Sequence, residues 1–359
     1  MSFFLAFLAF SALIILHEAG HFVAAKWTGM RVERFFLFFP PKLVSFRRGE
    51  TEYGIGSIPL GGFVKITGMN PDEELPPEVA ARGYYHQPVW KRIVVIGAGP
   101  AVNLFIAFFL LFFLAFGIQE PSQNVDQITS GSPATGKLMP GDRIVSVDGV
   151  SGDQTAIADQ INSHTCAVKD GEQPKDGCMA TEPATIVVDR NGQTETLKIT
   201  PVYDAEVERN RLGFAFGIQD LNPGVGEAAR ISVDYMWFVT SQTVSTLSQI
   251  WQADKREELS GVAGSYEVTR QAIDIGWRQA LTLIALISLS LGVINLFPFL
   301  PLDGGHIFWS LVEKFRGKPV PFAVMERAGI LGFALVIGLF LIGLSNDIDR
   351  LTGEGFNLR

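Results

Sequence analysis

The stretch SFFLAFLAFSALIILHEAGHFVAA, residues 2–25, contains the pattern His17-Glu18-Ala19-Gly20-His21, and no charged residue precedes that pattern. On an α-helix, two histidines four positions apart lie on one face about one turn apart, so both imidazoles can reach one metal ion. The glutamate beside the first histidine can act as general base on a water at that ion. The pattern therefore predicts metal-dependent hydrolysis, with His17 and His21 as ligands and Glu18 as the base.

The apolar residues around this pattern help to decide whether it is functional or a chance match. A short motif also arises by chance, and a histidine pair on a soluble helix is usually a polar surface feature. Here the three ionisable residues lie inside an apolar segment, where a charged side chain costs about 2.5–3.5 kcal/mol at the centre of a bilayer. Neutral imidazoles bound to a metal offset that cost. The position favours the functional interpretation.

The whole chain has the composition of a polytopic α-helical membrane protein. It has 359 residues, 47% of them hydrophobic, with a mean hydropathy of +0.24. Four stretches are long and apolar enough to cross a membrane: 3–25, 93–118, 280–302 and 328–345. No basic region precedes the first stretch and the histidine pattern lies within it, so we expect it to be retained rather than removed as a signal peptide.

The distribution of Lys and Arg predicts the orientation. The segment 26–92 holds ten of them, the connection after the third stretch adds four, and none precedes the first stretch. Cytoplasmic loops near membrane ends are enriched in these residues. We therefore expect 26–92 and the cytoplasmic ends of the first and third stretches to face the cytoplasm. Both termini and the long segment 119–279 then lie outside.

The long outer segment is acidic and holds both cysteines. Residues 119–279 carry 23 acidic and 13 basic side chains, which excludes the basic surface that nucleic-acid binding requires. Cys166 and Cys178 both lie in it, where oxidising conditions permit a disulfide; two free thiols are the alternative.

A catalytic zinc usually takes three protein ligands and leaves a fourth position for water, so one more ligand is needed. The end of the third stretch reads NLFPFLPLDGGH, residues 295–306. Its prolines break a helix just before Asp303, which is a candidate ligand. Asp303 can also be a helix cap ahead of the two glycines. His306, three residues further on, is a rival third ligand because imidazole suits zinc as well as carboxylate does.

The pairing of HEAGH with NLFPFLPLDGG closely resembles the site-2 proteases, the intramembrane zinc metalloproteases of peptidase family M50. The resemblance implies one zinc per chain, held by His17, His21 and Asp303, with Glu18 as the catalytic base. It also implies that Asn295 positions the substrate or stabilises the developing oxyanion, and that His306 lies beside the site without binding the metal. The implied reaction cuts the membrane helix of a single-span protein already trimmed outside: an anti-sigma factor, another regulatory membrane protein or a signal-peptide remnant.

Further segments resemble the bacterial branch of this family typified by RseP. The sequences 31–35 and 54–65 are similar to its membrane-associated β-hairpin, which we place at 42–66 with the turn at 47–51. The run Gly99-Pro100-Ala101-Val102-Asn103 is similar to the GPxxN element of the family. The resemblance implies a four-span protease core in two halves, residues 1–118 and 280–359.

The outer segment contains a PDZ-like signature. GSPA at 131–134 and LMPGDRIVSVDG at 138–149 resemble bacterial PDZ domains, and Asn191-Gly192 predicts a tight hairpin turn. We expect one inserted α+β PDZ domain over 119–203, which either binds the C-terminus of a peptide by strand addition or is only a folded spacer. In the connector 204–279, residues 227–251 form an amphipathic helix that lies on the lipid surface or packs against that domain.

Two other classes of function fit some of these features. An ion-coupled transporter could use His17, Glu18 and Asp303 as a proton relay. A non-catalytic PDZ adaptor in the membrane could bind a partner without cutting it. Intact HEAGH and LDG motifs favour the protease over both.

Overall fold

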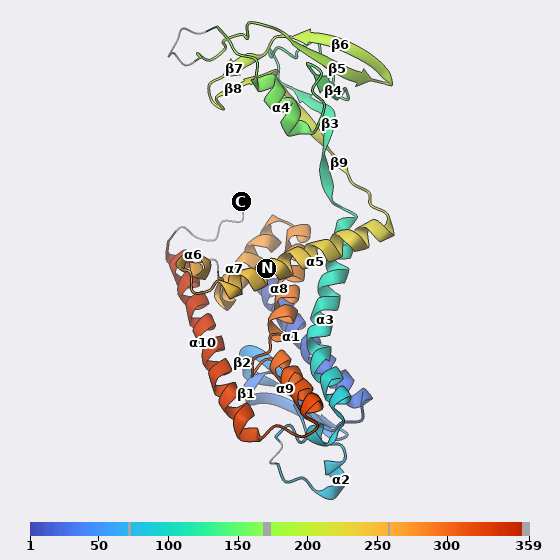
Figure 1. Cartoon of the computed structure of the whole chain (residues 1–359), viewed down its shortest axis with the longest axis vertical. Helices are drawn as coiled ribbons and strands as arrows, with labels where there is room; N and C mark the ends of the chain where they lie inside the picture. Colours follow the sequence, from blue (N-terminus) through green and yellow to red (C-terminus); the bar gives the residue numbers. More distant parts are fainter. Residues whose placement is uncertain (71–72, 168–173, 258, 354–359) are drawn as a thin grey trace. The chain divides into compact units, whose positions relative to one another are not determined.

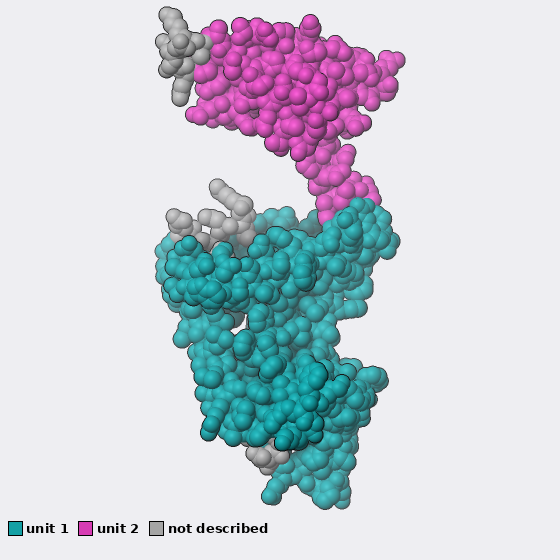
Figure 2. All heavy atoms as spheres, viewed as in Figure 1, with its two compact units in different colours: residues 1–115, 223–359 teal, residues 116–222 magenta. Residues whose placement is uncertain are grey.

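The protein is described by a computed structural model covering residues 1–70, 73–167, 174–257 and 259–353. The chain divides into two compact units (Figure 2). Residues 1–115 and 223–359 form unit 1, and residues 116–222 form unit 2, which is inserted between the two halves of unit 1.

Unit 1 is built on long helices, of which four in the described part of the chain are long and apolar enough to span a membrane. They are α1 (Ser2–Trp27), α3 (Val89–Ala115), α8 (Trp277–Asn295) and α10 (Phe322–Thr352). Each coincides with one of the four apolar stretches of the sequence. The first, second and fourth differ from expectation only at their ends, and α10 is longer at both ends than 328–345.

The third span ends earlier than the sequence suggested. We expected an apolar segment through residue 302, but α8 ends at Asn295 and a new helix, α9, covers Asp303–Arg316. Pro298 and Pro301 lie between the two helices and lack the backbone N–H that would continue the helix. The interruption separates the last turn of α8 from Asp303 and lets α9 start in a new direction (Figure 1).

A β-hairpin follows α1 directly. β1 (Val32–Arg48) pairs antiparallel with β2 (Thr51–Ile66), and Gly49 and Glu50 form the turn, inside the expected range 47–51. β1 begins ten residues before the expected start at 42, because its first half, VERFFLFF, continues the ladder toward the end of α1. The hairpin base shares a buried core with the ends of α1 and α3.

Close packing between α1 and α3 depends on Gly20 of the HEAGH pattern. A Cβ atom added there would lie 2.6 Å from the carbonyl oxygen of Ala98 and 3.0 Å from Val102 Cγ2. A side chain would therefore push the two helices apart. Only glycine allows this approach of the backbones.

A buried ion pair joins α3 to α9. Arg92 is 2% exposed and makes two hydrogen bonds to the carboxylate of Glu313, at 3.0 and 2.5 Å. The Arg92 guanidinium also lies over the ring of Tyr85, 5.3 Å from its centroid. The pair joins α9, which begins with Asp303, to α3, which packs on HEAGH.

The helices after unit 2 complete unit 1: α5 (Val225–Ser248), α6 (Ala253–Glu257) and α7 (Val262–Ile275). α5 runs crosswise to α3 and α10 (Figure 1), and its Met236 and Val239 pack on a core that includes Leu289 of α8. α5 is the amphipathic helix expected at 227–251. It belongs to the unit with the long helices and packs on them.

The C-terminal end of α10 is fixed to the start of α7 by a fully buried carboxylate. Asp347 accepts hydrogen bonds from the backbone N–H groups of Gly261 and Gly264, at 3.0 and 2.7 Å, and from the Ser260 hydroxyl at 3.1 Å. The donors are the unpaired N–H groups of a helix N-terminus, which favour an anion. Asp347 thus holds α10 in place.

Unit 2 contains a five-stranded sheet with the order β6-β5-β4-β3-β9. Its elements are β3 (Gln119–Ile128), β4 (Arg143–Val147), α4 (Gln154–Asn162), β5 (Ala184–Arg190), β6 (Gln193–Ile199), β7 (Val202–Asp204), β8 (Arg209–Arg211) and β9 (Phe214–Asp220). Asn191 and Gly192 form the turn between β5 and β6 with positive φ angles, as the sequence predicted. Cys166 and Cys178 are joined in a disulfide.

Unit 2 is longer than the expected domain 119–203. β9 lies in its sheet, antiparallel to β3, so residues up to 222 belong to it rather than to the connector. The partners Gln119 and Asp220 lie at opposite ends of the unit's sequence. Local patterns do not reveal a pairing over such a separation.

Glu50 at the hairpin turn provides a pH-dependent test of the hairpin's attachment. It binds Arg82 through two hydrogen bonds of 2.8 Å and Lys26 at 2.6 Å. The Arg82 guanidinium, followed by Lys26, lowers the pKa of Glu50 from 4.5 to about 2. A carboxyl with a lowered pKa stabilises the fold above pH 4.5 and loses this contribution as the pH falls toward 2.

We therefore expect Glu50→Gln to lower the free energy of unfolding at pH 6 by about 1 kcal/mol, after solvent screening of a partly exposed group. The difference from wild type should shrink as the pH falls below 4.5. Thermal unfolding in detergent at several pH values measures it. The exposed Glu78, changed to Gln, is the control, and a Glu50→Gln effect that is independent of pH would contradict the assignment.

The Arg92–Glu313 pair gives a second prediction. Glu313→Gln leaves a buried guanidinium without its counter-charge, and we expect a loss of about 3 kcal/mol in the free energy of unfolding. The double variant Arg92→Leu/Glu313→Leu should lose less than this, because no buried charge remains. Thermal unfolding compares the variants, with the exposed Glu326→Gln as control. Equal stability of wild type and Glu313→Gln would show that the pair does not hold the helices.

Candidate active site

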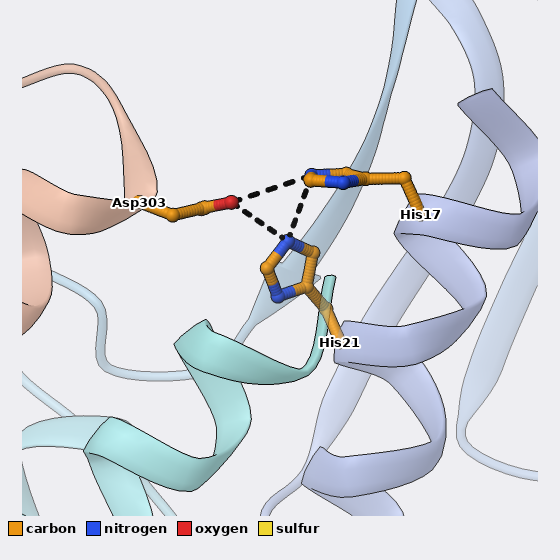
Figure 3. Close-up of side chains that lie close together, drawn as sticks. All are labelled: His17, His21 and Asp303. Atoms are coloured by element: carbon orange, nitrogen blue, oxygen red, sulfur yellow. Dashed lines mark hydrogen bonds and ion pairs between the residues drawn. The ribbon is translucent and has the colours of Figure 1, made fainter. Parts of the chain in front are cut away.

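Three side chains converge at the contact of α1 and α9 (Figure 3). His17 Nε2 and His21 Nε2 each lie 3.3 Å from Asp303 Oδ2, and the two nitrogens are 3.2 Å apart. The histidines come from successive turns of α1, and Asp303 reaches them from the first residue of α9. In the described part of the chain this is the group of His, Cys, Asp and Glu side chains that could hold a metal ion.

The triangle has the dimensions of a zinc site. Zinc takes nitrogen ligands at about 2.0–2.1 Å and carboxylate oxygens at about 2.0–2.2 Å in tetrahedral geometry. Two such ligand atoms are then about 3.3 Å apart. The three observed separations match this edge length, so the side chains can bind zinc without rearranging.

The polar atoms of the triangle are withdrawn from solvent. The side chains of His17, His21 and Asp303 are 10%, 9% and 17% exposed. Asp303 Oδ2 is buried and accepts no hydrogen bond within the described residues; the imidazole nitrogens are near it without hydrogen-bond geometry. A buried carboxylate oxygen without a donor is costly unless a cation binds it.

His21 is oriented by the backbone of α3. Its Nδ1 donates to the carbonyl oxygen of Val95 at 2.9 Å, which leaves the lone pair of Nε2 directed at the triangle. The ring lies against Gly99, where an added Cβ atom would overlap it. Gly99 therefore provides the space that the ligand occupies.

His17 is held from the same helix. The side-chain amide of Asn103 lies 3.0 Å from His17 Nδ1, and Asn103 is fully buried. Val95, Gly99 and Asn103 follow one another at helical spacing, so they lie on one face of α3. That face orients both histidines.

Asp303 is placed by the break between α8 and α9. Its carboxylate points to the imidazoles, and α9 has Leu302 at its N-cap with no side-chain cap (Figure 3). The geometry thus favours the ligand role over the capping role. Gly304 and Gly305 lie against the backbone of residues 296–300, where a Cβ atom would overlap it, and so allow the tight start of α9.

Glu18 lies beside the triangle and against the hairpin. It is half-buried, and a Cβ atom on Gly62 of β2 would be 2.9 Å from Glu18 Cγ. The absence of a side chain at residue 62 lets β2 approach the glutamate. The strand and the expected general base therefore share one site.

Asn295 and His306 are not among the three side chains of the ligand triangle. Asn295 is half-buried at the last position of α8. His306 lines a cavity of about 270 Å³, together with Trp309, Glu313 and Glu326. Asp303, and not His306, completes the group with the two histidines.

Several residues that shape this site could not be assigned a role from the sequence. Asn103 stands out only as part of the GPxxN resemblance, and the sequence does not predict that Val95, Gly20 or Gly99 shapes the surroundings of the histidines. A regular signal was present, because Val95, Gly99 and Asn103 recur at helical spacing in an apolar segment. What that face contacts depends on tertiary packing.

Gly99 gives a prediction with a matched control. Gly99→Ala places a methyl group in the space of the His21 ring, and we expect zinc affinity to fall at least tenfold. Gly97→Ala, one half-turn away, meets only Ile307 Cδ1 at 3.9 Å and should bind zinc as wild type does. Competition with a chelator measures both. Equal zinc affinity of the two variants would contradict the role of Gly99.

Comparison with known proteins finds relatives named as zinc metalloproteases. The zinc metalloprotease Rip1 of Mycobacterium tuberculosis is 32% identical to this chain, over 95% of each protein. A relative in Clostridium acetobutylicum is 30% identical over 97% of this chain and 98% of its own length. One in Brucella suis is 30% identical over 94% and 92%. The names of these two assign them provisionally to the zinc metalloproteases.

The profile of peptidase family M50 matches residues 5–339, which includes HEAGH, Asn103 and Asp303. The match extends over both halves of unit 1 and across the inserted unit. The chain belongs to peptidase family M50, the site-2 proteases, and is a membrane zinc metalloprotease.

Proposed function

We propose that this protein is an intramembrane endopeptidase that cuts a peptide bond in or near the transmembrane helix of a single-span protein. The observation that carries the proposal is the triangle of His17, His21 and Asp303, placed on helices that are apolar enough to span a membrane. One zinc ion per chain would be held by these three side chains. Zinc bound there supplies Lewis-acid polarisation of the scissile carbonyl and makes water more acidic.

The residues of the chain have distinct tasks in this reaction. Glu18 takes a proton from the attacking water and returns it to the nitrogen of the leaving amine, so the proton is conserved over the cycle. Asn295 positions the substrate near the end of α8. The support for Glu18 is its place next to His17 and against β2. His306 serves neither task and lines the neighbouring cavity.

The hairpin gives the substrate a place to unfold. A helical substrate hides the scissile carbonyl in its own hydrogen bonds, and these cannot be replaced by water inside a bilayer. β1 and β2 form one sheet in which residues 34–37 of β1 pair with both 52–55 and 62–65 of β2. The open edges of this sheet are therefore at 42–48 of β1 and 62–66 of β2. A locally unwound substrate can pair with β2 as an added strand. The close approach of Gly62 to Glu18 puts such a strand at the catalytic base.

We propose that unit 2 is a single PDZ domain that selects substrates by their trimmed ends. The support is the signature at 131–149 and a sheet whose outer strands, β6 and β9, each have one open edge for a peptide C-terminus. The chain then resembles the RseP branch, with one such domain where RseP has two. The alternative is a folded spacer. The disulfide between Cys166 and Cys178 fits an oxidising compartment.

The proposed location is the bacterial inner membrane, with unit 2 and both termini outside and the active site toward the cytoplasm. The support is the excess of Lys and Arg in 26–92 and in 314–327. Substrates of this arrangement include anti-sigma factors, other regulatory membrane proteins and signal-peptide remnants.

Two substitutions test the mechanism. Glu18→Gln removes the base but leaves the three ligands, so we expect stoichiometric zinc and a loss of cleavage of at least 100-fold. His17→Ala removes a ligand and should lose both zinc and cleavage. Metal analysis of the purified protein and cleavage of a single-span substrate in vesicles provide the two readouts. In cells with the Glu18→Gln form, a partly trimmed single-span protein should accumulate.

The outcomes separate the competing functions. Full cleavage by Glu18→Gln would refute the mechanism. Wild-type protein without stoichiometric zinc would favour the transporter with a proton relay of His17, Glu18 and Asp303. Stoichiometric zinc without cleavage of any single-span protein would favour the adaptor.

A further inference from the structure

The two zinc-binding histidines face different partners through their second ring nitrogen. A neutral imidazole carries one proton, so a ring that gives the lone pair of Nε2 to a metal must carry its proton on Nδ1. His21 satisfies this requirement, because Nδ1 lies 2.9 Å from a carbonyl oxygen, which can only accept. The tautomer of His21 is therefore fixed by the backbone.

For His17, no backbone carbonyl of the described residues is hydrogen-bonded to Nδ1. Its Nδ1 lies 3.0 Å from one end of the Asn103 side-chain amide, which can accept through oxygen or donate through nitrogen. A donating nitrogen would keep the proton of His17 on Nε2, and His17 could not then bind the metal. An accepting oxygen would keep the proton on Nδ1 and free Nε2. The amide therefore decides between the two tautomers.

We propose, on the basis of the function proposed above, that Asn103 is a positioning residue that holds His17 in its metal-binding tautomer. In the zinc-bound protein, Oδ1 of Asn103 accepts the hydrogen bond from His17 Nδ1–H. The lone pair of His17 Nε2 then points into the triangle with His21 and Asp303.

The surroundings of Asn103 permit this orientation. Asn103 is fully buried in α3. With the amide nitrogen toward His17, Oδ1 has no hydrogen-bond partner within the described residues. A half-turn about the Cβ–Cγ bond exchanges the two ends of the amide. Among the described residues it breaks only the hydrogen bond to His17, which it remakes with the opposite polarity. The orientation that suits zinc is therefore open to the side chain.

A purely structural role for Asn103 can be separated from this one. Its backbone oxygen accepts a hydrogen bond from the Ser288 hydroxyl of α8 at 2.9 Å, which contributes to the contact of α3 and α8. Ser288→Ala removes that bond and leaves the amide and His17 untouched. It is the matched control, because it disturbs the packing of the same residue without changing the tautomer.

The test compares zinc affinity by chelator competition and the visible absorption spectrum of the cobalt-substituted protein. Asn103→Leu keeps the shape but loses the acceptor, and we expect zinc affinity to fall about 10- to 100-fold with an altered cobalt spectrum. Asn103→Asp has an oxygen in the same place and should retain at least wild-type affinity. Asn103→Ala should resemble the leucine variant, and Ser288→Ala should stay within twofold of wild type.

The outcomes are distinguishable. If wild type binds no stoichiometric zinc, the proposed function itself fails. If wild type binds zinc and Asn103→Leu or Asn103→Ala binds it within threefold with an unchanged cobalt spectrum, only the role of Asn103 is overturned. The same holds if Asn103→Asp loses as much affinity as Asn103→Leu. The alanine variant and a thermal unfolding curve for each protein ensure that misfolding of one variant does not decide the question.

Discussion

One face of α3 carries the contacts on which the metal centre depends. Val95 and Asn103 orient the two histidines, Gly99 makes room for one of them, and Arg92 anchors the helix that presents Asp303. α3 itself contributes no ligand. Its position is set in turn by the contact of Gly20 with the backbone at Ala98. The three ligands are thus positioned by a helix that supplies none of them.

Buried polar contacts elsewhere in unit 1 serve the same purpose of fixing apolar helices. Helices in a lipid environment gain little from hydrophobic burial against one another, so small residues and polar pairs have to define their contacts. Arg92 with Glu313 joins α3 to α9, and Asp347 joins α10 to the start of α7. Gly261 brings the backbones close where α7 meets α10, and Gly20 does the same where α1 meets α3. Specific contacts of this kind hold the triangle within the few tenths of an ångström that zinc binding requires.

The sequence predicted the ligands better than the contacts that hold them. His17 and His21 can be predicted as a ligand pair from helical spacing alone, because both lie on one short segment. Asp303 is far away in sequence, and only the resemblance to a known family singled it out over His306. The expected third span ran past Asn295 although Pro298 and Pro301 already mark the end of α8 in the sequence. The membership of β9 in the sheet of unit 2 was missed because it depends on tertiary packing. Asn103 was quoted without a role for the same reason: its partner lies on another helix.

The approach of α1 to α3 also restricts the motif itself. In the general pattern HExxH the two central positions are free, yet here the second is occupied by Gly20, against which a neighbouring carbonyl oxygen lies. If HEAGH were moved onto another pair of helices, the neighbouring helix would have to approach Gly20 as closely as α3 does here. Otherwise the two histidines would be displaced from the third ligand. For protein design, the five residues of HEAGH therefore have to be transferred together with the part of the neighbouring helix that contacts Gly20.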